Sequence, residues 1–352
     1  MLLKQFYLSL FACYYNNYFC DTKKLYYIMV DLSVEVGNLK LRSPIVVSSS
    51  GLTMNVNNVV KYANAGAGAI VMKSLFEEQI SMTCDNMQFQ QDYTEAYDYI
   101  NQYVRNNEVN EYLNKIVELK KNIVIPVIAS INCKKNDSWV DFAVSVERSG
   151  ADAIEINFME IETDVFSNPN DIENRYIDIL TKLRKIISIP IWVKISYFHT
   201  SLPSFIDKIK AIGVESVTLF NRSFQADIDI ENEKIISSDI FTSNNDISNT
   251  IRFVGLISGV VKGIGISAST GIHSGKDIVK MILAGASSTQ MCTSIYKNGE
   301  MAIINSIDEL KEWMTKHGYK SVKEFKGKLS YGNIPSAVAF ERVQFMKYFS
   351  SK

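Results

Sequence analysis

The chain has 352 residues, 47% of them hydrophobic, with a formal net charge of −1 and an isoelectric point near 6.4. It is long enough for one large domain or two smaller ones, and its balanced charge gives no electrostatic argument for nucleic acid or an anionic membrane as partner. The five scattered cysteines indicate neither a disulfide framework nor a zinc site, the three separated histidines argue against a metal-centred mechanism, and no apolar run approaches the ~20 residues that span a bilayer.

Residues 1–28 are rich in aromatic side chains and hold only a weak apolar patch. A signal peptide is the alternative interpretation, but the patch is short and lacks a clean small-residue cleavage site. We therefore expect residues 1–28 to be an extension outside the fold, and residues 29–352 to form a single domain that begins at Met29. The unpaired cysteines suit a reducing compartment, so we expect a cytoplasmic protein.

Residues 32–41 alternate apolar and polar side chains around Gly37-Asn38, which indicates a β-hairpin. Short buried strands then alternate with amphipathic helices, the pattern of α/β folds. We predict strands at 44–47, 69–74, 125–133, 153–157, 190–195, 215–220 and 264–268 and in a last run ending at residue 292, and helices at 55–65, 108–120, 138–149, 247–261 and 274–284.

These eight strands are divided by no linker or shift in composition. The most economical fold is a single (β/α)8 TIM barrel with the N-terminal β-hairpin as a cap over its bottom. C-terminal helices are predicted at 303–316, 322–325 and 336–348. Two segments interrupt the rhythm: 75–108, a polar and aromatic stretch expected to be a lid or binding loop, and 224–246, expected to be a small hairpin over the carboxyl face.

In a TIM barrel, polar residues at the carboxyl ends of the strands are candidates for the active site. Two lysines and three asparagines there, without a histidine or a carboxylate pair, argue against general hydrolysis and suit a planar, partly anionic cofactor such as FMN. A lysine on the surface is the alternative for each lysine, but unpaired charge in an apolar strand is costly. The asparagines at 132 and 221 could equally be turn formers. The candidates are Ser49, Ser50, Lys73, Asn132, Asn157, Lys194, Asn221, Ser269, Thr270 and Thr293.

The stretch 264–293, IGISASTGIHSGKDIVKMILAGASSTQMCT, reads as strand, loop, helix, strand and loop. The loops after the last two strands of a barrel lie side by side, where backbone N–H groups and a helix N-terminus can cradle a phosphate. Small residues let the backbone approach the phosphate oxygens. Ordinary turn residues are the alternative interpretation.

With these motifs the chain resembles the dihydroorotate dehydrogenase family, in its soluble FMN-containing branch and most closely the divergent dihydroorotate dehydrogenase-like bacterial members. The resemblance covers about residues 30–345 and rests on VVSSSGLT, IVMKSL, IEINFMEIETD, IPIWVKIS, VTLFNRSFQADIDIE, SASTGIHSGKDIVKMILAGASSTQM and HGYKSVKEFKGKLS, in that order. It implies oxidation of dihydroorotate to orotate in pyrimidine biosynthesis, with a hydride passing from C6 to flavin N5 and a proton from C5 to a base.

The resemblance also implies roles for individual residues. The flavin would be contacted by Ser50, Gly51, Lys73, Ser74, Asn157 and Lys194, and its phosphate by Thr270, Gly271, Cys292 and Thr293. The substrate would be contacted by Lys73, Asn157 and Asn221. The family places a catalytic cysteine three residues after the asparagine matched by Asn157, and this chain has Glu160 there. Glu160 is therefore the candidate base, and Lys73 is the second candidate catalytic residue. The alternative for Glu160 is an acidic loop that is simply solvated.

Two other functions stay open at this stage. A barrel lyase could use Lys194 or Lys73 as a Schiff-base amine, and the chain could be a non-catalytic relative that keeps the barrel. The sequence has no iron–sulfur cysteine motif and no GxGxxG after a strand, so we expect an electron carrier as partner. We also expect a small-molecule substrate and the homodimer that the resemblance implies.

Overall fold

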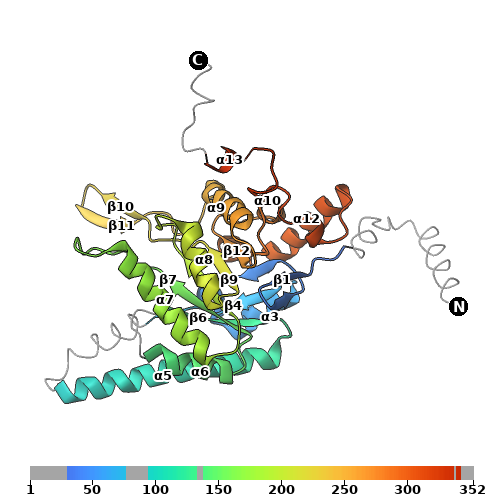
Figure 1. Cartoon of the computed structure of the whole chain (residues 1–352). Helices are drawn as coiled ribbons and strands as arrows, with labels where there is room; N and C mark the ends of the chain where they lie inside the picture. Colours follow the sequence, from blue (N-terminus) through green and yellow to red (C-terminus); the bar gives the residue numbers. More distant parts are fainter. Residues whose placement is uncertain (1–29, 77–93, 133–137, 337, 342–352) are drawn as a thin grey trace, which may run out of the picture.

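The computed structural model describes residues 30–76, 94–132, 138–336 and 338–341 (Figure 1). Its main sheet is parallel and closes on itself, because β13 pairs with β3 while β4 pairs with both β3 and β6. Apart from the two-residue β5 (Leu75–Phe76) beside β6, the strands alternate with helices, which confirms the predicted (β/α)8 barrel. The barrel strands are β3 (Ile45–Val47), β4 (Ala69–Val71), β6 (Val127–Asn132), β7 (Ala153–Phe158), β8 (Ile191–Ile195), β9 (Ser216–Leu219), β12 (Gly265–Ser269) and β13 (Ser288–Met291).

The helices surround the barrel, and several begin at side-chain caps. Asn55, Asn168 and Ser274 each accept a hydrogen bond from a backbone N–H of the first helical turn. The α-helices are α3 (Val56–Asn64), α5 (Thr94–Asn122), α6 (Ser138–Arg148), α7 (Pro169–Ile186), α8 (Leu202–Ile212), α9 (Ile247–Val260), α10 (Gly275–Ala284), α11 (Thr293–Asn298), α12 (Met301–Lys316) and α13 (Val338–Glu341). Short 3-10 turns are η2 (Gly51–Thr53), η3 (Asn244–Asp246) and η4 (Val322–Glu324).

One predicted boundary is wrong. The helix expected from residue 108 begins at Thr94 in α5, so the second half of the supposed loop 75–108 is helical. Residues 94–122 contain neither glycine nor proline, so nothing in the sequence stops the helix from extending toward its amino end. Residues 77–93 of that segment lie outside the described chain. Helices α7 and α8 occupy connections for which no helix is predicted above.

The hairpin formed by β1 (Val34–Val36) and β2 (Leu39–Leu41) closes the end of the barrel where its strands begin. Val36 and Leu41 are buried there against barrel residues that include Val46 and Trp192. A Cβ at Gly37, whose φ is +60°, would lie 2.6 Å from the Glu215 Cβ, so the hairpin turn is seated directly on the barrel. The predicted cap is confirmed.

The interior of the barrel changes character along its axis. Beside the hairpin it is apolar, whereas nearer the carboxyl ends of the strands it holds buried polar side chains. Residues two apart on a strand point to the same face, so each strand contributes to both layers. The buried polar residues include Ser130, Glu155, Asn157, Lys194, Thr218, Ser267, Ser288 and Gln290.

The segment 224–246 forms the predicted hairpin, β10 (Ala226–Asp229) and β11 (Lys234–Ser237), which projects from the body of the molecule (Figure 1). The chain after β11 returns to the barrel, where Thr242 is buried. Helix α12, η4 and α13 confirm C-terminal helices, although most of the predicted 336–348 lies outside the described residues, as does the extension 1–28. Among the described helices, none combines the length and apolarity needed to cross a bilayer.

Candidate active site

Residues of three barrel strands, and of the loops that follow four barrel strands, surround one cavity of 220 Å³ at the carboxyl end of the barrel. The fold itself gathers them, because parallel strands all end at this face. The cavity is lined by Ser48, Ser49, Lys194, Asn221, Arg222, Ile240, Phe241, Thr242, Ser269, Thr270, Gly271, Ile272, Gln290, Cys292, Thr293 and Tyr296. Eight of the residues singled out from the sequence are therefore brought together: Ser49, Lys194, Asn221, Ser269, Thr270, Gly271, Cys292 and Thr293.

Lys194 is the buried cation of this cavity, with 6% of its surface exposed. Its Nζ donates hydrogen bonds to Ser48 Oγ at 3.3 Å and to Gln290 Oε1 at 3.1 Å. Both direct acceptors are uncharged oxygens, so the ammonium makes no direct ion pair with a described residue. The arrangement leaves a cation at the wall of the cavity that is available to an anionic or electron-rich ligand.

Two asparagines lie at the same level as Lys194. Asn132, Asn157 and Lys194 are partners in register on the adjacent strands β6, β7 and β8. The Asn221 Nδ2 donates a hydrogen bond to the Asn157 Oδ1. The side-chain amides at these strand ends therefore form one polar layer with the ammonium, which places Asn157 next to the cavity that Asn221 lines.

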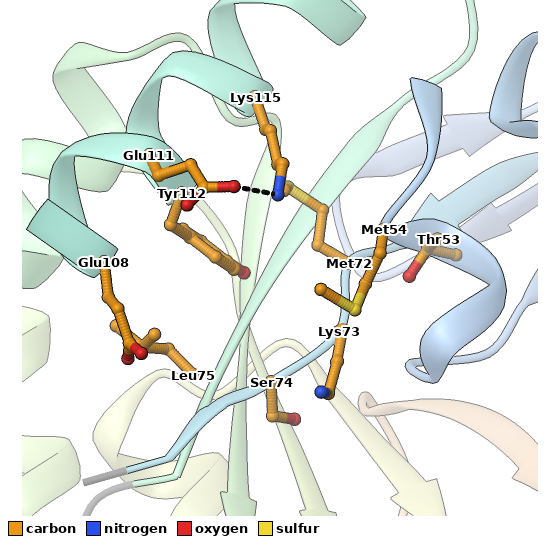
Figure 2. A pocket seen from close by; sticks show the side chains of 10 residues that line it. All are labelled: Thr53, Met54, Met72, Lys73, Ser74, Leu75, Glu108, Glu111, Tyr112 and Lys115. Atoms are coloured by element: carbon orange, nitrogen blue, oxygen red, sulfur yellow. Dashed lines mark hydrogen bonds and ion pairs between the residues drawn. The ribbon is translucent and has the colours of Figure 1, made fainter. Parts of the chain in front are cut away.

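Lys73 lies in a neighbouring cavity. This space of 320 Å³ lies between η2 and α5 and shares no lining residue with the Lys194 cavity. Figure 2 shows the Lys73 ammonium on the same side of it as the Ser74 hydroxyl, away from the Glu111–Lys115 ion pair. The two cavities adjoin through serines, because Ser74 Oγ lies 3.1 Å from Ser49 Oγ. Lys73 therefore borders the site without facing Lys194 directly.

The loops after β12 and β13 lie side by side, as the predicted cradle requires. Thr270 and Gly271 both have left-handed backbones, with φ of +84° and +80°. The Thr270 Oγ1 donates a hydrogen bond to the Phe220 carbonyl at 3.1 Å, which holds that turn in place. At Gly271 a Cβ would lie 2.3 Å from the Ile247 nitrogen at the start of α9. Only glycine allows this close approach of loop and helix.

Ser50 and Cys292 meet beside this cradle. The Ser50 Oγ accepts a hydrogen bond from the Leu52 N–H and so caps η2. Burial raises the pKa of the Cys292 thiol, while a hydrogen bond with Ser50 and the charge of Lys194 act in the opposite direction. Cys292 is therefore a thiol at the cavity wall rather than a ready thiolate.

Two residues that the sequence did not single out, Thr242 and His273, lie beside Thr293 of the cradle. Thr242, from the chain after the projecting hairpin, donates a hydrogen bond to Thr293 Oγ1 at 3.0 Å and lies 3.0 Å from His273 Nε2. Burial lowers the pKa of His273, which favours the neutral imidazole in the folded protein. Nothing in the spacing of the sequence relates these residues, since they meet only through the fold.

Glu160 lies apart from the Lys194 cavity. Its Oε2 is 2.5 Å from the Arg175 Nη2 of α7, and its side chain lines a third cavity of 500 Å³ that also includes Tyr176 and His199. Burial, followed by the charge of Glu160, raises the pKa of Tyr176 to about 12. The third cavity shares no lining residue with the Lys194 cavity. In this structure the candidate base is therefore held in an ion pair outside the Lys194 cavity.

Comparison with known proteins gives a consistent result. The family model described as dihydroorotate dehydrogenase matches residues 31–314. The catalytic subunit of dihydroorotate dehydrogenase B (NAD(+)) from Thermoplasma acidophilum is 26% identical over 310 residues, which covers 85% of this chain and 99% of the relative. The chloroplastic dihydropyrimidine dehydrogenase (NADP(+)) of Arabidopsis thaliana is 21% identical and covers 84% of this chain and 76% of the relative. A putative dihydroorotate dehydrogenase A (fumarate) from Aeropyrum pernix is 22% identical, with 86% and 98% covered.

Proposed function

The chain belongs to the dihydroorotate dehydrogenase family, and we propose that it is an FMN-dependent enzyme that oxidises dihydroorotate to orotate in pyrimidine biosynthesis. As a dihydroorotate dehydrogenase-like protein it is an oxidoreductase acting on CH–CH groups. The oxidation takes a hydride from C6 of the substrate and a proton from C5. The relatives named above for dihydroorotate and dihydropyrimidine support a reduced pyrimidine ring as the substrate class.

The chemistry of the cavity fits FMN. The observation that carries the cofactor is Lys194, a buried ammonium whose hydrogen-bond partners in the described chain are uncharged oxygens. Such a cation suits the pyrimidine edge of a flavin, where negative charge develops on reduction. When bound, FMN would supply the hydride acceptor. We propose that its ring is held by Ser50, Gly51, Lys73, Ser74, Asn157 and Lys194 and its phosphate by Thr270, Gly271, Cys292 and Thr293.

The asparagine pair suits a cyclic amide substrate. The bond between Asn221 Nδ2 and Asn157 Oδ1 leaves the Asn157 Nδ2 and the Asn221 Oδ1 without a hydrogen-bond partner among the described residues. One donor and one acceptor side by side match the C=O and N–H of a ring amide. We propose that Asn157 and Asn221 orient the substrate in this way and that Lys73 borders its other side.

We propose Glu160 as the base that takes the C5 proton. A base must come within hydrogen-bond reach of the proton it removes. In the described structure its carboxylate is in an ion pair with Arg175. Glu160 can serve only if the connection between β7 and α7 moves, so that the carboxylate leaves Arg175 and faces the Lys194 cavity.

The electron acceptor would be supplied by another molecule. One relative is named as the catalytic subunit of an NAD(+) enzyme, and another is named for fumarate. This sequence carries no iron–sulfur motif and no GxGxxG after a strand. We propose an electron carrier as partner and a homodimer as the assembly.

The decisive experiment is an anaerobic visible spectrum of the purified protein before and after dihydroorotate, with dihydrouracil, which lacks the carboxylate, as the matched substrate control. We expect a flavin spectrum that dihydroorotate bleaches and dihydrouracil does not. Bleaching by dihydrouracil alone would keep the cofactor and reject dihydroorotate. A colourless protein that takes up no added FMN would reject the cofactor, and reduction by borohydride with substrate bound would then test a Schiff base.

A further inference from the structure

Glu155 is a buried carboxylate inside the barrel with no role in the site described so far. It is fully buried on β7, two residues before Asn157. Its Oε2 accepts hydrogen bonds from Gln290 Nε2 at 2.7 Å and from Thr218 Oγ1 at 2.8 Å. Its Oε1 has no hydrogen-bond partner among the described residues. A carboxylate so placed is costly to bury unless a positive charge compensates it.

A chain of hydrogen bonds joins this carboxylate to Lys194. The Gln290 side chain donates to Glu155 through Nε2 and accepts from Lys194 Nζ through Oε1, at 2.7 and 3.1 Å. The anion at the amide N–H and the cation at the amide oxygen polarise the amide in the same direction, so the two hydrogen bonds strengthen each other. The bond to Glu155 therefore turns the Gln290 oxygen toward Lys194, and the bond to Lys194 turns the Gln290 N–H toward Glu155.

The strand register supports the same arrangement. Asn157 and Lys194 are paired positions on β7 and β8, and side chains two residues apart share a face of the strand. Glu155 therefore lies one layer deeper in the barrel than the level of Lys194. The cation faces the cavity, and its counter-charge lies behind it.

We propose that Glu155 is the counter-ion of Lys194, coupled to it through the side-chain amide of Gln290, and that this relay positions the ammonium at the cavity wall. Glu155, which does not line the cavity, is thus a positioning residue that acts through Gln290 at the cavity wall. That the ammonium serves a flavin rests on the proposed function, whereas the coupling of the two charges does not.

The test is a double-mutant cycle on the full-length protein, with denaturant unfolding followed for wild type, E155Q, K194M and the double variant. Each single change leaves one buried charge without its counterpart, and the double change removes both. We expect the unfolding midpoint of the double variant to lie above that of K194M. The matched control is E215Q, a partly buried carboxylate bonded to Arg184 and to the Ile191 N–H at the opposite end of the barrel. The loss of unfolding free energy caused by E215Q should simply add to the loss caused by K194M, with no rescue when the two changes are combined.

Additive losses in the E155Q–K194M pair would overturn the pairing. If E155Q alone does not fold, recovery of folded protein in the double variant supports the pairing, and failure to recover it overturns the pairing. Each unfolding curve is measured without and with saturating FMN. If FMN shifts no curve, the proposed function fails while the cycle still decides whether Glu155 and Lys194 are coupled.

Discussion

Replacing Gly271 by alanine should destabilise the protein by more than the backbone cost of replacing a left-handed glycine elsewhere. The residue has a φ of +80°, and a Cβ there would lie 2.3 Å from the Ile247 nitrogen and 2.6 Å from the Ile247 Cα. The left-handed backbone alone costs a non-glycine residue about 1–2 kcal/mol. Both clashing atoms are backbone at the start of α9, so the loop and helix must separate, which adds about 1–3 kcal/mol. We expect a loss of about 2–5 kcal/mol in the free energy of unfolding, measured by denaturant titration.

Gly263 provides the matched control. Its φ of +82° is nearly the same, but a Cβ there would meet nothing within 4 Å. Gly263→Ala should therefore cost only the backbone part, about 1–2 kcal/mol, and should leave FMN affinity unchanged. Gly271→Ala should also weaken FMN binding, measured by quenching of flavin fluorescence. Equal destabilisation by the two substitutions would refute the close approach of loop and helix that defines the cradle.

The remaining predictions concern charged and titratable groups. Lys73→Ala should weaken FMN binding, whereas Lys115→Ala, on the far side of the same cavity, should not; equal FMN content in both variants would remove Lys73 from the cofactor site. Glu160→Gln should lower the turnover number by about a hundredfold or more with flavin retained, and Glu162→Gln in the same loop should remain active, so that an active Glu160→Gln enzyme would exclude this base. Burial lowers the pKa of His273, so below pH ~6.5 the unfolded chain binds more protons than the folded one. The contribution of His273 to the free energy of unfolding should therefore be complete above that pH and should be lost as the medium is acidified toward the lowered pKa. Between pH 7.5 and pH 5, His273→Gln should show a smaller drop in unfolding midpoint than the wild type.

The fold could be predicted because its signals are local and repeated. Short apolar runs, amphipathic helices and the hairpin turn at Gly37 each depend on neighbouring residues, and their order alone indicates a barrel. The start of α5 could not be placed, because residues 94–108 contain neither glycine nor proline and carry no clear apolar stripe. There the sequence permits a helix without requiring one.

The candidate site was predictable to the extent that the barrel assembles it. Lys194, Asn221 and the two small-residue loops meet because all strands end at one face. Glu160 pairs with Arg175 of α7, and Lys73 lines the cavity beside α5; no spacing in the sequence reveals either arrangement. Glu155 could have been found, since it is a charged residue within the apolar strand AIEIN, the same signal that identified both lysines.

The pairing of β3 with β13 has a consequence for how the chain is made. Ile45 lies opposite Thr289, so the first barrel strand finds its second neighbour only among the last residues of the barrel to be synthesised. At about 5–20 residues per second, translation from one partner to the other takes roughly 12–50 seconds. Throughout that interval the apolar strand β3 has an unpaired edge, a template for association with other chains. The nascent protein therefore presents that edge for a long period before its own fold can cover it.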